Sequence, residues 1–456
     1  MPSYRPRLTR KALAGCALGV LLSLPLPAAA HTLGGRSSLP APLSYFLAGV
    51  ATLLVIGFVV LAAGWPRSRW QSGTQIRAIA VPGWRWVVAL LRAGGVAGLV
   101  LVVLAGVIGP PNSARNPGPV LVWVVFWLVV PLAGALLGDL YRLLNPVRSL
   151  SALLGADLTG TRRPRESWGV WPATLAFSGF VWFELIYPNP DHPRHLAIAV
   201  VCYTALLLGV GERFGRGTAM AQFDAFGTYN RLISAIGPMD LDPEGGPGWR
   251  GWLRQLPVIP EVPGVTAFVI IMIGSVAFHG MSAASRFESA FGGFGRSIAG
   301  RSLLLLITVV LVGTAYWITC RYVTGRSAAG SSTASVARRF IHCLVPIAFS
   351  YVFSHYFTAV VFEGQIILST VSDPFGLGWN LFGTALRPVD FTILSTTAVW
   401  WIQVSGIAAG HLTALILVHD RALLDLPGPT GVRGRSAFLG LITLLAIVGI
   451  TILATG

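Results

Sequence analysis

Ionisable side chains lie inside several long apolar stretches of this chain, and they are the first candidates for chemistry. Glu184 lies in the stretch 169–187, His279 in 264–284 and His355 in 340–362. An ionisable group inside a membrane span is costly, so each marks a candidate functional site. Counting about 1.5 Å per helical residue places all three at a similar depth, in the outer half of the membrane. Imidazole and carboxylate groups act as general acids and bases and also bind zinc or copper.

Two further residues extend this outer layer. Glu363 follows the span of His355 near the membrane surface, and it completes the catalytic candidates Glu184, His355 and Glu363. His31 becomes the first residue of the mature chain if a signal peptide is cleaved after Ala30, and an α-amine with an imidazole can chelate copper. The alternative is that the cleavage site simply tolerates histidine there. The candidate metal ligands are therefore His31, His279 and His355, open to the outside of the cell.

A second layer of histidines lies toward the cytoplasm. His342 stands near the start of its span, and His411 and His419 stand near the end of the next one. The eight-residue gap turns a helix by about 80° beyond two full turns, so His411 and His419 project from one broad face. Histidines on facing helices can bind a b-type haem or relay protons, which makes all three cofactor-binding candidates. The alternative for His419, which precedes Asp420 and Arg421, is an ordinary cytoplasmic helix end.

The composition indicates what surrounds the segments that carry these groups. Of the 456 residues, 54% are hydrophobic and 11% are charged, against roughly 25% charged in soluble proteins. A soluble fold is excluded, and the main partner of the chain is the lipid bilayer. The net charge of +16 comes almost wholly from arginines clustered between apolar stretches. That is the positive-inside pattern of a multi-pass cell-membrane protein, and it argues against a nucleic-acid partner.

The expected fold is an all-α transmembrane bundle of about ten spans in one domain, 31–456, after a cleaved signal peptide, 1–30. The apolar stretches run over about 42–64, 86–109, 119–138, 169–187, 195–212, 264–284, 302–320, 340–362, 390–418 and 436–455. The arginine clusters then place both mature termini outside the cytoplasm. The largest cytoplasmic loop, about 213–262, predicts an interfacial helix followed by a flexible Pro- and Gly-rich segment.

Several local strings resemble a known family over most of the mature chain. They are His31-Thr32-Leu33-Gly34-Gly35-Arg36, Gly64-Trp65-Pro66-Arg67, Asn145-Pro146, Gly211-Glu212-Arg213, His355-Tyr356, Glu363-Gly364-Gln365, Ser372-Asp373-Pro374, Ala409-Gly410-His411 and His419-Asp420-Arg421-Ala422. Together they are similar to the fenitrothion hydrolase-like membrane proteins of actinobacteria. The resemblance implies a phosphotriester hydrolase. Such enzymes typically use one or two metal ions to activate water, and a small apolar substrate can arrive through the lipid.

Two other classes of function stay open. The same residues can bind cargo or carry protons in a proton- or metal-coupled transporter, because Pro131, Pro172 and Pro346 interrupt spans as substrate paths often require. The chain can also be a haem or copper redox subunit. It contains no GxxxxGK[ST], HExxH or GxSxG motif. An ATP-driven pump, a common zinc peptidase and a serine hydrolase are therefore disfavoured.

Overall fold

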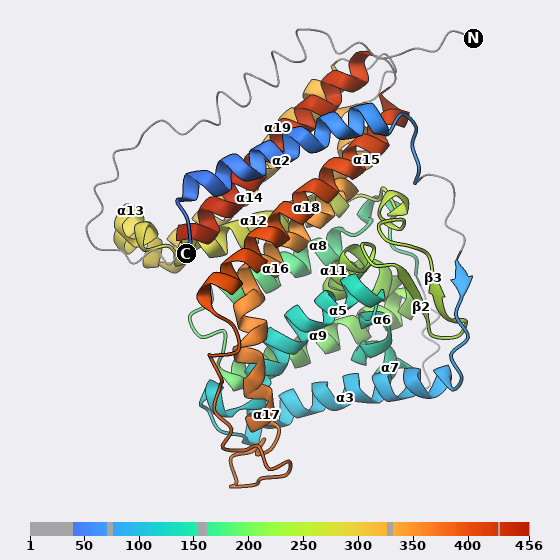
Figure 1. Ribbon diagram of the computed structural model, residues 1–456. Helices are drawn as coiled ribbons and strands as arrows, with labels where there is room; N and C mark the ends of the chain where they lie inside the picture. Colours follow the sequence, from blue (N-terminus) through green and yellow to red (C-terminus); the bar gives the residue numbers. More distant parts are fainter. Residues whose placement is uncertain are drawn as a thin grey trace.

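The computed structural model describes residues 40–70, 76–153, 160, 162–325, 332–426 and 429–455. These residues form the all-α membrane bundle that the composition predicts (Figure 1). Within the described ranges, nine helical segments are long and apolar enough to cross a membrane. They are α2 (Leu43–Gly64), α3 (Trp84–Ile108), the segment Pro117–Leu137, α9 (Pro193–Phe214), α12 (Val265–Ala283), α14 (Ile298–Thr324), the segment Thr333–Val361, α18 (Thr396–Asp425) and most of α19 (Pro429–Thr455). The chain is an integral, multi-pass membrane protein.

The predicted span 169–187 is the one of the ten that is not among these nine segments. It is a shorter helix, α8 (Trp171–Leu185). Its 15 residues extend about 22 Å, less than the ~30 Å of hydrocarbon. It still runs the length of the bundle. The Thr174 hydroxyl donates to the Gly264 carbonyl at the start of α12, and the Leu185 carbonyl accepts from Arg301 near the start of α14. Because α12 and α14 begin at opposite ends, α8 joins those ends.

Two of the long segments are interrupted helices. Pro117–Leu137 consists of α4 (Pro117–Pro119), the π-helical segment η2 (Val120–Val129) and α5 (Val130–Leu137). Pro131 has no N–H to donate to the carbonyl of Trp127, so a regular α-helix cannot continue through this point. Thr333–Val361 consists of α15 (Thr333–Phe340), the 3₁₀ segment η6 (Ile341–Leu344) and α16 (Val345–Val361), which has Pro346 in its first turn.

The two ends of the bundle differ in structure. Figure 1 shows that α2 begins and α19 ends at the same end, beside α13 (Ser285–Arg296), and this end is named the α13 end. The opposite end carries an antiparallel sheet of β1 (Arg77–Ala78), β3 (Gly246–Trp249) and β2 (Met239–Asp242), and it is named the sheet end. The arginine-rich connections lie at the sheet end, which is therefore the end predicted to face the cytoplasm.

The connection over 213–262 differs from the interfacial helix and flexible segment that the sequence predicts. Most of α11 (Ala225–Ser234) is buried, and it packs against α5 and α8. Asp224 caps it, accepting from the Gly227 backbone N–H at 3.0 Å. The Pro- and Gly-rich part is an ordered hairpin of β2 and β3, with Gly246 at a φ of 87° beside the turn, a conformation that favours glycine. Several polar residues of this connection, Asp224, Thr228, Asn230, Ser234 and Arg250, are buried inside the protein.

Short elements complete the described chain. They are η1 (Ser113–Arg115), α6 (Tyr141–Leu144), α7 (Pro146–Leu153), η3 (Glu166–Trp168), α10 (Arg216–Thr218), η4 (Ala219–Phe223), η5 (Leu256–Val258), η7 (Glu363–Gln365) and α17 (Ile366–Thr370). Among them η4 is a second π-helical segment, and it leads directly into α11.

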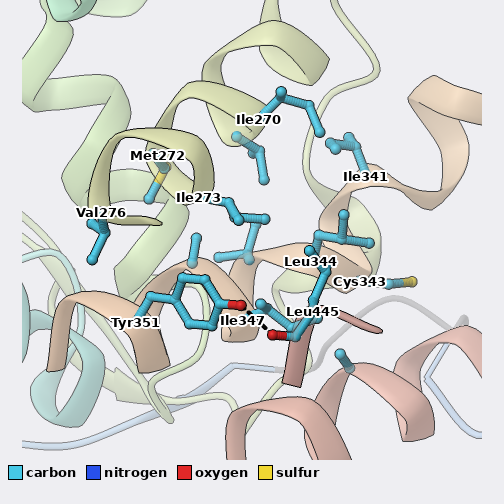
Figure 2. Close-up of a cluster of buried hydrophobic side chains, with 14 of the residues drawn as sticks. Ile270, Met272, Ile273, Val276, Ile341, Cys343, Leu344, Ile347, Tyr351 and Leu445 are labelled. Atoms are coloured by element: carbon cyan, nitrogen blue, oxygen red, sulfur yellow. Dashed lines mark hydrogen bonds between the residues drawn. The ribbon is translucent and has the colours of Figure 1, made fainter. Parts of the chain in front are cut away.

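The core lies where α12, α16 and α19 meet. Figure 2 shows Ile273, Ile347 and their apolar neighbours packed around Tyr351, whose hydroxyl donates to the Leu445 carbonyl of α19. On its other side α16 packs closely against α18. A Cβ at Gly410 would lie 2.6 Å from the carbonyl oxygen of Pro346, so only glycine allows this approach. Small residues commonly permit such close packing of membrane helices.

Candidate functional site

Three of the residues predicted to share the outer layer come together near the α13 end. Tyr356 links two of them: its hydroxyl donates to Glu184 Oε1 at 2.8 Å and lies 2.7 Å from His279 Nδ1. The ring of His355 lies beside that of His279, with the centroids 4.6 Å apart. The cluster forms because α12 packs against both α8 and α16. Glu184, His279, His355 and Tyr356 are named the outer cluster.

The single hydroxyl hydrogen of Tyr356 determines the direction of the hydrogen bonds. While this hydrogen is donated to Glu184, the Tyr356 oxygen can only accept from His279. Nδ1 of His279 therefore carries the proton of the neutral imidazole, and Nε2 is the free acceptor. This assignment of the tautomer follows from the network. The cluster can thus receive a proton at Nε2 of His279 and deliver one to Glu184 through the phenol.

Trp127 is a second hydrogen-bond donor to Glu184. Its indole N–H donates to Oε1 at 3.1 Å, and its ring stacks on Tyr229 of α11 with the centroids 4.6 Å apart. Oε1 therefore accepts from both the Trp127 indole and the Tyr356 hydroxyl, and within the described residues no donor reaches Oε2. Trp127 lies on the π-helical segment η2, and π-helical turns are frequent at functional sites.

His355 makes no hydrogen bond to the described part of the protein, but it borders a small cavity. The cavity has a volume of about 20 Å³ and is also lined by Tyr351, Ser354 and Gly449. This is the size of one water molecule, and the lining supplies polar partners. A Cβ at Gly280 would lie 3.2 Å from His355 Cε1, so glycine on α12 lets the imidazole pack there. His355 is therefore placed to exchange a proton with water.

Glu363 does not join the outer cluster. It lies beyond the end of α16, in η7, and it is exposed. Partial burial and the nearby negative charge of Asp191 raise the pKa of Glu363. This carboxylate therefore belongs to the surface of the α13 end, close to the connection between α8 and α9.

Two of the three histidines toward the sheet end have local partners of their own. His419 uses both ring nitrogens: Nε2 lies 2.9 Å from the Trp65 carbonyl oxygen, and Nδ1 lies 3.3 Å from the Arg435 guanidinium. These contacts favour the ordinary helix end over a haem ligand at His419. The Nε2 atom of His342 lies 3.4 Å from Sγ of the adjacent Cys343, and both side chains are buried.

His411 differs from the other two because it keeps one ring nitrogen unused. It is fully buried, and its Nδ1 lies 2.7 Å from the Ile407 carbonyl oxygen. Its Nε2 atom has no hydrogen-bond partner among the described residues. The ring of Tyr351 lies 5.8 Å from that of His411, and Tyr351 also lines the cavity at His355. Polar groups therefore continue from the outer cluster toward the middle of the bundle.

The predicted metal site has two neighbouring imidazoles in its favour, those of His279 and His355. Across the described ranges, no three His, Cys, Asp or Glu side chains are grouped so that they could hold a metal ion. His31 and the signal segment 1–30 lie outside the described residues. The described side chains do not fit a three-ligand zinc or copper site. The chemistry that they support directly is proton transfer.

Tyr356 and Trp127 are the members of the site that sequence reasoning missed. Neither side chain carries a charge, so neither draws attention as a costly group in a span. A signal was nevertheless present for each. Tyr356 directly follows His355, and Trp127 stands four residues before Pro131, where the missing N–H disturbs the helix.

Comparison with known proteins adds no family to this description. No protein-family model, curated protein or solved structure matches the chain. The function has to be inferred from the geometry of the site.

Proposed function

We propose that this membrane protein is a proton-coupled transporter in which the outer cluster passes a proton between His279 and Glu184. The observation that supports the proposal best is the pair of hydrogen bonds, 2.8 and 2.7 Å long, through which one phenol joins a carboxylate to an imidazole inside the bundle. Intramembrane carboxylates and histidines in such chains are typical of proton relays in pumps and transporters. Histidine suits this role because its two ring nitrogens can take up a proton at one atom and release one at the other.

The transfer can be written with every proton accounted for. A proton arrives at Nε2 of His279 and makes the imidazolium. The proton on Nδ1 then moves to the Tyr356 oxygen while the phenol's own hydrogen moves to Glu184 Oε1. His279 is left neutral with its proton on Nε2, Tyr356 is neutral again, and Glu184 is protonated. One proton has moved, and the negative charge of Glu184 has been neutralised.

Among the described residues, the polar groups between the outer cluster and the sheet end do not form a continuous path for protons. They include His355, its cavity, Tyr351 and His411, but the next histidine on α18 is His419, eight residues or about 12 Å further on. A continuous path would let protons leak through the protein. An interrupted path favours a carrier, because its two halves connect only when one part of the bundle moves against another.

The test is proton uptake into vesicles that contain the purified protein and a trapped pH dye. A potassium diffusion potential drives uptake of protons. Inorganic phosphate is present on both sides of the membrane as a trial solute. We expect uptake by the wild type and a reduction of about 100-fold in Tyr356→Phe and in Glu184→Gln, the scale of a lost proton-transfer group. Tyr45→Phe is the control, because it removes a phenol oxygen from a side chain that is 70% exposed on α2. Wild-type uptake no faster than that of empty vesicles would contradict the proposal.

Hydrolysis is the second candidate, and the water-sized cavity at His355 is the observation that favours it. An imidazole that borders a water site can act as a general base, which would serve the phosphotriester hydrolysis implied by the family resemblance. The assay is release of nitrophenolate from a nitrophenyl phosphotriester by detergent-purified protein. Release that disappears in His355→Ala, together with no proton uptake in vesicles, would favour the hydrolase over the transporter.

A further inference from the structure

A second polar site lies at the sheet end, beside α11, the helix whose Tyr229 stacks on Trp127. It is a cavity of about 570 Å³, a volume within the range of small-molecule sites. Its walls come from the region that follows α5, from η4 and α11, from β2, from the residue that follows β3, and from the start of α12. Four arginines line it, Arg142, Arg148, Arg231 and Arg250. This space is named the arginine cavity.

Two of the four arginines have carboxylate neighbours. The Arg250 guanidinium lies 3.6 Å from Asp240 and donates to the Ser234 carbonyl at 2.9 Å, and its side chain is buried. It therefore ties the hairpin to α11. The Arg142 guanidinium lies 3.9 Å from Asp242, a long contact between two partly exposed side chains. The Arg250 side chain therefore stabilises the fold, whereas Arg142 makes only a long ion pair.

The other two arginines have no carboxylate within ion-pair distance among the described residues. Arg231 donates to the Ala221 carbonyl at 2.8 Å, to the Thr228 hydroxyl at 2.9 Å and to the Met220 carbonyl at 3.3 Å. All three acceptors are neutral. The Arg148 guanidinium makes neither a hydrogen bond nor an ion pair within the described ranges. Burial lowers the pKa of both arginines, but a guanidinium stays charged in proteins.

The aspartates of the cavity do not neutralise these two charges by contact. Asp224 is fully buried and accepts from neutral donors: Asn145 Nδ2 at 2.9 Å, the Tyr203 hydroxyl at 2.8 Å and the Gly227 N–H at 3.0 Å. Asp139 accepts from the backbone N–H of residue 142 at 3.1 Å. Within the described residues neither carboxylate lies within ion-pair distance of an arginine, so the Arg148 and Arg231 guanidinium groups line the cavity without a carboxylate in direct contact.

We propose that the arginine cavity binds an organic phosphate through Arg148 and Arg231. The free guanidinium fork of Arg148 matches the oxygens of a phosphate group, and the positive charges of Arg148 and Arg231 suit the two negative charges of a phosphate monoester. The Thr228 hydroxyl stands beside Arg231 as a further polar group. Gln222 Oε1 also lines the site, buried and without a partner in the described chain, and it can accept from a hydroxyl on the rest of the ligand.

The same chemistry can come from two sources, a soluble phosphate ester or the headgroup of a lipid. Both can reach the sheet end if it faces the cytoplasm, as the arginine distribution predicts. The idea that this phosphate is the transported solute rests on the proposed transporter function. The binding itself does not, because it requires neither a proton gradient nor the outer cluster.

The experiment is calorimetric titration of the full-length, detergent-purified protein with two probes that share one headgroup. Glycerol 3-phosphate represents the soluble source, and dioctanoyl phosphatidic acid represents the lipid. We expect at least one probe to bind, and Arg148→Gln to weaken that probe roughly 10- to 100-fold, the scale of a lost charge-assisted contact. Arg231→Lys keeps the positive charge, so we expect a smaller loss of affinity.

The control variant is Arg115→Gln, on η1 away from the sheet end, where the side chain is exposed. It should bind as the wild type does. Because the Arg148 guanidinium makes no hydrogen bond or ion pair within the described ranges, Arg148→Gln should keep a melting temperature close to that of the wild type. No heat from either probe, or equal affinity in wild type and a folded Arg148→Gln, would overturn the inference. Binding without proton uptake in vesicles would keep the phosphate site and remove the transporter.

Discussion

The hydroxyl of Tyr356 lies 2.8 Å from Glu184 Oε1, although the two residues are 172 positions apart in the chain. This hydrogen bond joins α16 to α8. The same phenol also contacts His279 on α12, so one side chain links three helices that cross the bundle. The protonation of Glu184 therefore depends on how α8, α12 and α16 pack together.

Tyr356→Phe should change the infrared signature of Glu184. The phenyl ring can fill the same space, but Glu184 then keeps only the Trp127 donor. A protonated carboxyl group that loses a hydrogen bond absorbs at a higher C=O frequency. The measurement is an acid-minus-alkaline infrared difference spectrum, with Glu184→Gln used to identify the band and Tyr45→Phe as the control. A band at the same frequency in wild type and Tyr356→Phe would show that the phenol does not contact the carboxyl group.

The depth of each candidate in the membrane could be predicted from the sequence, because a helix rises by a constant amount per residue. Counting from the ends of the spans places Glu184, His279 and His355 in one layer, and these residues do meet. Counting cannot show which helices are neighbours. That depends on the shapes of the helix faces, as at Gly280, where the missing side chain makes room for His355.

The arginine cavity could not be predicted in the same way. Arg148 belongs to one connection and Arg231 and Arg250 to another, and each fits the general excess of positive charge expected on cytoplasmic loops. The strands β2 and β3 have only four residues each, and β3 lies in a Pro- and Gly-rich stretch without the alternation that marks a strand. Only the folded hairpin shows that these charges converge on one space.

Asp420→Asn should destabilise the packing of α2 against α18. The Asp420 carboxylate accepts from the Trp65 indole at 3.0 Å, the Ser68 hydroxyl at 2.8 Å and the Arg69 backbone N–H at 2.7 Å. An amide has one acceptor oxygen where the carboxylate has two, so at least one donor loses its partner. We expect a loss of about 1–3 kcal/mol, seen as a lower melting temperature in detergent.

Asp425→Asn is the matched control for that substitution. Asp425 pairs with Arg421 at 2.7 Å, four residues earlier on the same helix. Arg421 also pairs with Glu261 at 3.2 Å, so its charge keeps a partner and the loss of stability should be smaller than for Asp420→Asn. A melting temperature lowered equally by the two variants would show that the contacts of Asp420 do not hold α2 in place.

Gly410→Ala should force α16 and α18 apart. The added methyl group would lie 2.6 Å from the Pro346 carbonyl oxygen and would also meet the side chain of Ser350. Overpacking of this kind costs about 1–3 kcal/mol. Gly49→Ala is the control, since no atom lies within 4 Å of its added Cβ. If both variants melt at the wild-type temperature, the close approach of the two helices is not needed for stability.

Anion binding in the arginine cavity should strengthen as the pH falls below neutral. Burial raises the pKa of Asp139 above its ordinary 3.8, although the backbone N–H of Arg142 and the charges of Arg231, Arg142 and Arg148 act to lower it. Asp139 also acts electrostatically on Arg250. As the pH falls through the raised pKa, the carboxylate takes up a proton and the cavity loses one negative charge. The arginines keep their charges, so the attraction for an anion increases.

Sulfate is the probe for this prediction, because it stays doubly charged over the range in which a carboxylate titrates. Its affinity is measured by calorimetry at a series of pH values in wild type and in Asp139→Asn. The variant should bind sulfate more tightly at neutral pH and should lose most of the pH dependence. Buried Asp224 also has a raised pKa, caused by its burial, and it accounts for any remaining slope. A full wild-type pH dependence in Asp139→Asn would show that another group controls the charge of the cavity.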